Sequence, residues 1–338
     1  MNRPEYFIGV DIASATFTAT VLSSPTQVVV LGEELPNTPD GFAGFVTDLQ
    51  ARQISPDNCI VVMEATGVYG ERLCYFLHSK GYAVAVEPPR EVKKAFHSKR
   101  KNDAVDSQQI AEYGYRFFDT LRFWGPKADV LQQIAALLTS REQFTKQLTA
   151  DKNALRALKR KAVQTPLANR LFEKNIRRLH KDIQAIDQAI EELIRQDPTL
   201  RKNAGLVNSV PGVGLLLTAN LMVITSGFNN HLKPRSLAAY LGICPYEHES
   251  GSSVHTKPRS DRYGNGKARK LLHLAARSTA THKHNFRAYY LRKLAEGKPK
   301  RVALNNIANR LLRIICAVLR DGAPYCETHR SVHPALVA

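Results

Sequence analysis

The chain has 338 residues, which suggests two or three folding units and is enough to bury a core without disulfides or a structural metal. Its 48 Lys and Arg residues outnumber its 30 Asp and Glu residues, so the formal net charge is +18. This excess favours a polyanionic partner, because each phosphate that a cation neutralises releases a counterion. The alternative is a basic protein without such a partner.

Composition argues against several other classes. No uninterrupted apolar run reaches the roughly 18 residues of a membrane span, and the nearest, residues 215–228, is too short and too polar. Asp11 interrupts the only apolar stretch near the N-terminus, so we expect no secretory signal. The five cysteines are scattered, which favours neither a disulfide framework nor a zinc ribbon. We therefore expect a cytoplasmic protein with no membrane partner.

Residues 1–90 differ from the rest in charge and in pattern. They hold five basic and ten acidic residues, a net charge of −5, so the remaining 248 residues carry +23. Short β-branched and aromatic runs predict three successive strands, and helices and strands then alternate. The predicted strands cover 6–12, 17–22, 28–31, 59–63 and 83–86. Three helices are predicted: one that starts at Thr38-Pro39-Asp40, one that includes residues 73–77, and one that starts near Asp103.

This order predicts the fold class of the first segment. A doubly wound sheet would place a helix after its first strand. Three strands followed by parallel α/β units are typical of a ribonuclease-H-like (resolvase-like) domain. We assign this α/β domain to residues 1–125.

The next segment, residues 126–204, is predicted to be a long helical coiled-coil hairpin. One helix covers about 129–160, and Pro166 separates it from a second. The second helix carries apolar residues spaced alternately by three and four, the repeat of a coiled-coil seam: Ile176, Leu179, Ile183, Ile186, Ile190 and Leu193. Such a hairpin can pack on itself or on a second subunit, and we assign it to oligomerisation.

Residues 205–326 form a basic, mostly α-helical C-terminal domain, and residues 327–338 a tail. The domain starts with Val210-Pro211-Gly212-Val213-Gly214 between two helical patterns. This turn resembles a helix-hairpin-helix, in which Gly212 and Gly214 would let backbone amides approach a phosphate. An ordinary tight turn between helices is the alternative.

Four acids are candidates for a metal site. Asp11 lies at the end of the first predicted strand and Glu64 at the end of the fourth. Asp103 and Asp106 are three residues apart at the start of a helix, so both project from one face. In a ribonuclease-H-like sheet the first and fourth strands are neighbours, and a helix packed across them would gather all four carboxylates.

Gathered carboxylates require a compensating cation, and their oxygens suit Mg²⁺, or Mn²⁺ in its place. Two such ions can stabilise both the entering and the leaving oxygen of a phosphodiester exchange. The ordinary explanation of Asp103 and Asp106 is that acids are favoured at a helix start. Asp11 is harder to explain in that way, because an acid in an apolar strand is costly unless it is paired. Just before the helical acids lie five basic residues, Lys93, Lys94, Lys99, Arg100 and Lys101. They suit a nucleic-acid backbone passing the metal, although such a run is ordinarily a solvated face.

The four acids and the second half of the chain resemble a known family. Asp11, Glu64 and the Asp103-x-x-Asp106 pair are similar to the DEDD motif of insertion-sequence transposases, which join a Holliday-junction-resolvase-like domain to a C-terminal transposase domain. The family includes the pilin-gene invertases and the bridge-RNA-guided serine recombinases. The C-terminal resemblance lies in 209–214, in Ala238-Ala239-Tyr240-Leu241-Gly242-Ile243-Cys244-Pro245 and in Glu249-Ser250-Gly251-Ser252-Ser253.

The resemblance implies a DNA transposase or site-specific recombinase. It implies Mg²⁺ at Asp11, Glu64, Asp103 and Asp106, and a nucleophilic serine, matched by Ser250, that links covalently to DNA. It also implies homodimers that pair into a tetramer, donor and target DNA as substrates, and guidance by a structured RNA. By itself, the stretch 250–253 would be interpreted as a flexible polar loop, and Ser252 and Ser253 are the nearest alternative nucleophiles.

The chain departs from its relatives near this serine. Where many carry a basic pair this chain has Tyr246-Glu247-His248-Glu249, and a Lys-x-Gly motif becomes Arg262-Tyr263-Gly264-Asn265. These changes affect the residues that would contact phosphate near the serine. Positive charge is still supplied by two clusters that we predict to bind nucleic acid: Lys257, Arg259, Arg262, Lys267, Arg269 and Lys270, and then Lys298, Lys300 and Arg301.

Three other functions are to be weighed against strand exchange. A hydrolytic resolvase-like nuclease would use the same acids with metal-bound water as the attacking group. A sugar-kinase or actin-like ATPase also begins with an acid-bearing strand, but it needs glycine where this chain has Ala13. A non-catalytic nucleic-acid scaffold would not need Asp11 inside an apolar strand.

Overall fold

A computed structural model describes residues 3–65, 67–96, 102–229, 233–250, 254–260 and 264–327, except for the side chains of 247–250, 254–259 and 284. The chain divides into two compact units, Met1–Pro126 and Lys127–Ala338. Each unit is described by itself.

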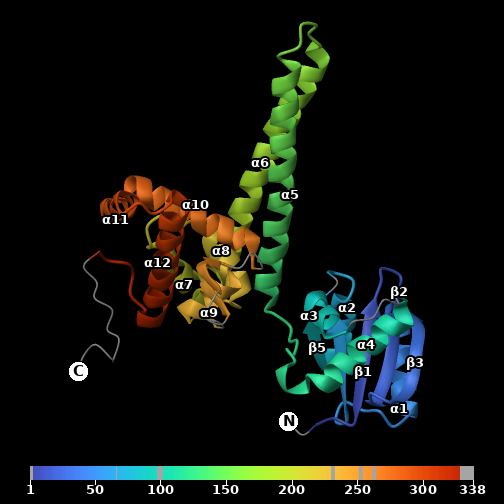
Figure 1. Cartoon of the computed structure of the whole chain (residues 1–338). Helices are drawn as coiled ribbons and strands as arrows, with labels where there is room; N and C mark the ends of the chain where they lie inside the picture. Colours follow the sequence, from blue (N-terminus) through green and yellow to red (C-terminus); the bar gives the residue numbers. More distant parts are fainter. Residues whose placement is uncertain are drawn as a thin grey trace, which may run out of the picture. The chain divides into compact units, whose positions relative to one another are not determined.

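The first unit is built on a five-stranded mixed sheet with the order β3-β2-β1-β4-β5 (Figure 1). The first three strands are antiparallel, whereas β1 pairs in parallel with β4 and β4 with β5. The strands are β1 (Tyr6–Ile12), β2 (Thr16–Ser24), β3 (Gln27–Pro36), β4 (Cys59–Glu64) and β5 (Ala83–Glu87). The prediction of an α/β first domain is therefore confirmed.

Helices pack on both faces of this sheet. On one face α1 (Pro39–Ala51) and α2 (Glu71–Ser79) place Phe42, Leu49 and Leu73 in one apolar cluster with the strands. On the other face α3 (Pro89–Ala95) and α4 (Asp103–Arg116) contribute to a second cluster with β4 and β5, and a short helical turn, η1 (Phe118–Thr120), follows. The sequence patterns missed the short helix α3, in which Pro89 occupies the first turn.

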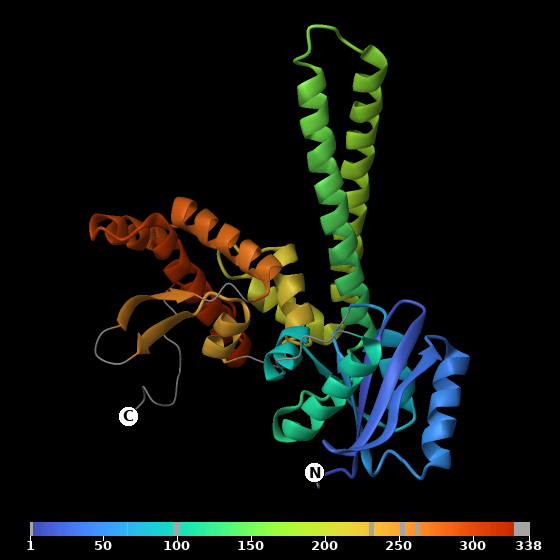
Figure 2. The same cartoon turned by 45° about the vertical axis from the view of Figure 1, so that its right-hand side comes forward.

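The second unit begins with two long helices, α5 (Asp129–Leu158) and α6 (Pro166–Gln196), which lie side by side along most of their length (Figures 1 and 2). Arg141 and Asp187 join them through two hydrogen bonds of 2.5 and 3.0 Å. Further along the pair, Leu148, Leu179 and Ile183 form a separate small apolar cluster. The two helices are present as predicted, while coiled-coil packing in the strict sense remains a prediction.

The rest of the second unit is mostly helical around one core. Its helices are α7 (Pro198–Asn208), α8 (Leu215–Ile224), α9 (Pro234–Tyr240), α10 (Gly266–His282), α11 (His284–Ala295) and α12 (Lys300–Asp321). The base of the long helices shares this core, because Leu131 and Ile134 of α5 and Ile190 and Ile194 of α6 belong to it. Between α9 and α10 the strands β6 (Pro245–Ser250) and β7 (Val254–Ser260) form a two-stranded hairpin that the sequence patterns did not indicate.

Helix α12 is the central helix of this core. It is the one helix among the described residues that is long and apolar enough to cross a membrane, since its most apolar 18-residue stretch has a mean hydropathy of 1.4. In the protein 44% of that stretch is buried, and Ile307, Leu311 and Ile315 pack into the core. This packing accounts for its apolar composition.

Candidate active site and nucleic-acid contacts

Two of the four candidate acids lie at the ends of neighbouring parallel strands. Asp11 is the penultimate residue of β1 and Glu64 is the last residue of β4, and Val10 pairs with Met63 in register. Because side chains alternate along a strand, Asp11 shares a face with Gly9 and Glu64 shares a face with Val62. Both acids are half-buried.

Helix α4 lies directly against this face of the sheet. A Cβ atom at Gly9 would overlap the Ser107 carbonyl oxygen and the Ala111 backbone nitrogen, so only glycine allows helix and strand to approach so closely. A buried hydrogen bond of 2.8 Å joins the Ser107 and Thr20 hydroxyls and fixes the helix on β2. The helix thus crosses the face on which Asp11 lies.

The other two acids occupy the first turn of α4. Asn102 caps this helix, and its side-chain oxygen accepts a hydrogen bond of 2.8 Å from the Val105 amide. Asp103 is exposed and Asp106 is half-buried. The start of the helix therefore presents two carboxylates beside the strand ends.

The pKa shifts of Asp11 and Glu64 reflect burial and electrostatic interactions among these groups. The pKa of Asp11 is raised, first by burial and then by the negative charges of Asp106 and Asp103. The pKa of Glu64 is also raised by burial and, more weakly, by Asp11 and Asp106, whereas the positive charge of Lys93 opposes the rise. The structure thus brings the four predicted acids into one electrostatic neighbourhood, with Lys93 as its basic member.

The chemistry of this donor set fits a hard divalent cation, because oxygen ligands are those that Mg²⁺ prefers and a cation would relieve the repulsion at Asp11. The four side chains do not form a closed coordination sphere. Within the described part of the chain, no three His, Cys, Asp or Glu side chains come close enough together to hold a metal ion. Metal binding at this site would therefore require the carboxylates to move towards one another.

The basic residues predicted beside the acids are described only in part. Lys93 is exposed and lies close enough to lower the pKa of both Asp11 and Glu64. Lys94 instead forms an ion pair of 3.3 Å with Glu91 on the same helix. The predicted residues Lys99, Arg100 and Lys101 lie outside the described residues.

Ser250, the predicted nucleophile, belongs to the second unit. It is the last residue of β6 and pairs in register with Val254 of β7. Its side chain, and residues 251–253, lie outside what the structure describes, as do the side chains of Lys257 and Arg259 and the whole of Arg262. The backbone places Ser250 at the end of β6, opposite the first residue of β7.

The start of α10, just after this hairpin, is held against the end of α9. The Asn265 side chain caps α10 by accepting from the Ala268 amide at 3.0 Å, and the Asn265 amide donates to the Tyr240 carbonyl at 3.0 Å. A Cβ atom at Gly264 would lie 2.6 Å from the Gly242 nitrogen. The Gly264-Asn265 pair thus has a packing role.

The turn between α7 and α8 gives its two glycines different surroundings. Gly212 has a φ of 77°, and a Cβ atom there would lie 2.8 Å from both the Ala275 carbonyl oxygen and the Thr279 Cγ2. Gly212 is therefore required for a left-handed turn that packs on α10. Gly214 precedes α8 with open space around it, so a phosphate contact by its amide stays a prediction.

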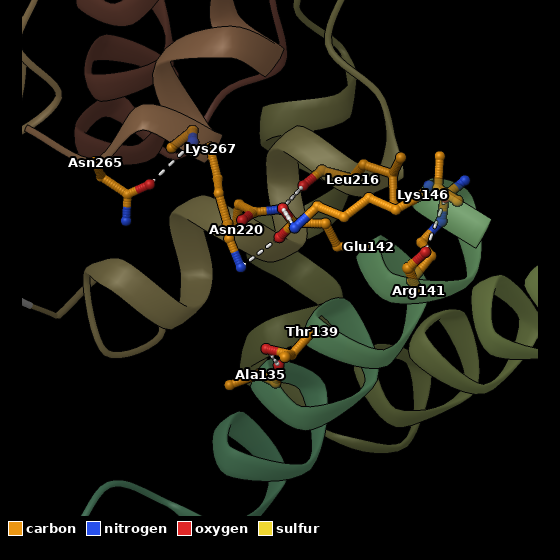
Figure 3. Close-up of polar contacts among 11 residues, drawn as sticks. Ala135, Thr139, Arg141, Glu142, Lys146, Leu216, Asn220, Asn265 and Lys267 are labelled. Carbon is orange, nitrogen blue, oxygen red and sulfur yellow. Dashed lines mark hydrogen bonds and ion pairs between the residues drawn. The ribbon is translucent and has the colours of Figure 1, made fainter. Parts of the chain in front are cut away.

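Lys267, one of the predicted nucleic-acid contacts, is engaged within the protein. Figure 3 shows its ammonium group, on α10, paired with the Glu142 carboxylate of α5, which also pairs with Lys146 at 3.0 Å. Hydrogen bonds from both lysines lower the pKa of Glu142, and the one from Lys267 has the larger effect. This contact links the middle of α5 to α10, the helix that follows the β6–β7 hairpin.

The two predicted basic clusters of the second unit meet at His273, which the sequence patterns missed. Burial lowers the pKa of this half-buried histidine, and the positive charges of Arg269 on α10 and Arg301 on α12 lower it further. Lys270, Lys298 and Lys300 are exposed. A positively charged surface therefore gathers where the start of α10 meets the start of α12, and it suits phosphate groups.

Comparisons with known proteins agree on one group. Residues 8–161 match a family profile described as a transposase of the DEDD, IS110 type, and residues 204–291 match one described as "Transposase IS116/IS110/IS902 family". The chain is 27% identical over 323 residues to the pilin gene-inverting protein of Moraxella lacunata, covering 94% of this chain and 97% of that protein. It is 29% identical over 291 residues to the transposase for insertion sequence element IS1111A of Coxiella burnetii, covering 78% and 79%. The first match contains all four acids and the second contains Ser250.

Proposed function

The chain belongs to the IS110 family of transposases and is a DNA recombinase, and from this premise we propose that it exchanges DNA strands through Ser250 with divalent metal held by Asp11, Glu64, Asp103 and Asp106. We further propose that the first unit is a ribonuclease-H-like domain. The strand order β3-β2-β1-β4-β5, with three antiparallel strands followed by parallel ones, supports this assignment.

The observation that carries the proposal is the electrostatic coupling of the acids. Asp11 and Glu64 come from adjacent strands and Asp106 from a helix packed across them, yet the charge of Asp106 raises the pKa of both. Burial and repulsion of this kind have a cost in a metal-free protein, which favours a functional role over an incidental one. Mg²⁺ or Mn²⁺ bound there would stabilise the negative charge on the entering and leaving oxygens of a phosphodiester.

Ser250 supplies the attacking group in this proposal. Its hydroxyl oxygen bonds to the phosphorus, its proton leaves, and the displaced sugar oxygen departs with a proton. The resulting phosphoserine keeps the free energy of the broken phosphodiester, so attack by a second strand's hydroxyl rejoins DNA and restores the serine. Its place at the end of β6, inside the second of the two family matches, supports the role.

The remaining parts of the proposal concern partners and assembly. Resemblance to the family supports a structured guide RNA, homodimers that pair into a tetramer, and a division into residues 1–125, 126–204 and 205–326. Sequencing of RNA that co-purifies with the protein tests the first of these. A single structured RNA species is expected, whereas random cellular fragments would contradict it.

A suicide DNA substrate, nicked so that the cut strand diffuses away, tests the chemistry. The wild-type protein with Mg²⁺ is expected to give a protein–DNA adduct that survives a denaturing gel. Substitution Ser250→Ala should abolish the adduct, while Ser252→Ala and Ser253→Ala, the matched controls, should keep it.

The same gel separates strand exchange from hydrolysis. Free cleaved ends that persist in the Ser250→Ala variant would show that water attacks and would support a resolvase-like nuclease. An adduct that moves to Ser252 or Ser253 would show a serine mechanism with the wrong residue assigned.

A further inference from the structure

Charge is distributed unequally along the hairpin of α5 and α6. Residues 152–181, its distal half, contain ten Lys and Arg residues and one acid, Glu173, for a net charge of +9. The proximal parts, 129–151 and 182–196, contain three basic and seven acidic residues, for a net charge of −4. In both views the distal half projects away from the core of its own unit (Figures 1 and 2).

On α6 the cations lie on the face opposite the apolar seam. Arg170, Lys174, Arg177 and Lys181 are spaced by four, three and four residues, which aligns them in one stripe about 16 Å long. All four are exposed, whereas Leu179, between them in sequence, is buried against α5. The stripe therefore faces solvent.

A similar group of cations lies on the last turns of α5 and just after its end at Leu158. Lys152, Arg156, Lys159 and Arg160 are exposed and line a shallow cavity of about 390 Å³ together with Leu155. Among the described residues, only one of these ten cations, Lys159, lies within ion-pair distance of a carboxylate, which belongs to Glu173. Most of the positive charge of the distal half is thus not neutralised by the protein itself.

The composition of the distal half indicates which polyanion it suits. Its one Phe, Tyr or Trp residue, Phe172, is half-buried, so His180 is the only exposed ring on which an unpaired base could stack among these described residues. Straight rows of cations match a regular duplex, which carries about one negative charge per 1.7 Å of its axis. We propose that the distal half of the α5–α6 hairpin is a docking surface for the phosphate backbone of duplex DNA, and not only an oligomerisation element.

Salt dependence of duplex binding tests this proposal. The full-length Arg177→Gln/Lys181→Gln variant and the wild type are titrated onto a fluorescent DNA duplex at several salt concentrations. Metal is left out, so the result does not depend on the proposed metal site or on Ser250. Each lost phosphate contact should reduce the slope of log K against log salt by about 0.9, so a decrease of up to roughly 2 is expected.

The matched control removes two exposed cations elsewhere, in Arg201→Gln/Lys202→Gln on α7, and should leave the slope unchanged. The Arg177→Lys/Lys181→Arg variant keeps both charges and should retain the wild-type slope. Circular dichroism establishes that each variant is folded. Equal losses in both neutralised variants would overturn the proposal, as would a loss of affinity confined to a folded RNA hairpin or a change of oligomeric state without a change in DNA affinity.

Discussion

At the scale of single residues, the site contains charges that the metal-free protein accommodates poorly. Burial and the acids of α4 raise the pKa of Asp11, and burial raises that of Glu64. A carboxyl group with a raised pKa binds its proton more tightly in the folded state than in the unfolded one. The folded state therefore loses stability as pH rises from the ordinary carboxyl pKa, about 4, through the raised value.

The Asp11→Asn variant removes one of these charges. Without metal at pH 7 it should melt above the wild type, because the substitution removes a half-buried charge that the acids of α4 repel. Each 1 kcal/mol gained would raise the melting temperature of a unit of this size by about 4 °C. The difference should shrink as pH falls through the raised pKa of Asp11 towards about 4, and below that it should not change further, because the carboxyl is then protonated in both the folded and the unfolded state. Addition of Mg²⁺ should stabilise the wild type and not the variant. Calorimetry with and without EDTA measures both effects, and a variant less stable than the wild type at pH 7 would contradict the account.

At the scale of elements, the sequence predicted much of the scaffold but not the contacts that complete it. Strand patterns and the Asp103-x-x-Asp106 spacing were enough to place the four acids on β1, β4 and α4, because these depend on local periodicity. The close packing of α4 at Gly9 depends on a long-range approach that no local pattern encodes. The same holds for the pairing of Lys267 with Glu142, and for the β6–β7 hairpin, whose polar residues resembled a loop.

Helix α4 should be sensitive to any side chain beneath it. Gly9→Ala places a methyl group against the backbone of Ser107 and Ala111, and we expect it to lower the free energy of unfolding by about 1–3 kcal/mol. Gly44→Ala in α1 is the matched control, because it is exposed, helical and has nothing within 4 Å of the added Cβ. The Gly44→Ala change should raise the free energy of unfolding by roughly 0.5–1 kcal/mol, because alanine favours a helix more than glycine does. Urea unfolding measures both changes, which should be opposite in sign. A Gly9→Ala variant as stable as the wild type would disprove the close approach of α4 to β1.

At the scale of the whole molecule, the proposed chemistry is divided between two compact units. The four acids belong to Met1–Pro126, whereas Ser250 and most of the basic residues belong to Lys127–Ala338. The charge of the chain follows this division, since residues 1–126 hold 12 basic and 15 acidic residues, a net charge of −3, and residues 127–338 hold 36 and 15, a net charge of +21. We infer that the second unit contributes most of the attraction to DNA, and that the first contributes the metal.

The most direct test of this account is Mn²⁺ binding followed by electron paramagnetic resonance, in which bound Mn²⁺ is lost from the signal of the free ion. The wild type should bind Mn²⁺ and release it to excess Mg²⁺. Asp11→Asn, Glu64→Gln and Asp106→Asn should each weaken binding about tenfold or more, while the exposed-acid control Asp57→Asn should not. Mn²⁺ binding that is equally strong in the wild type and in both Asp11→Asn and Glu64→Gln would contradict the account.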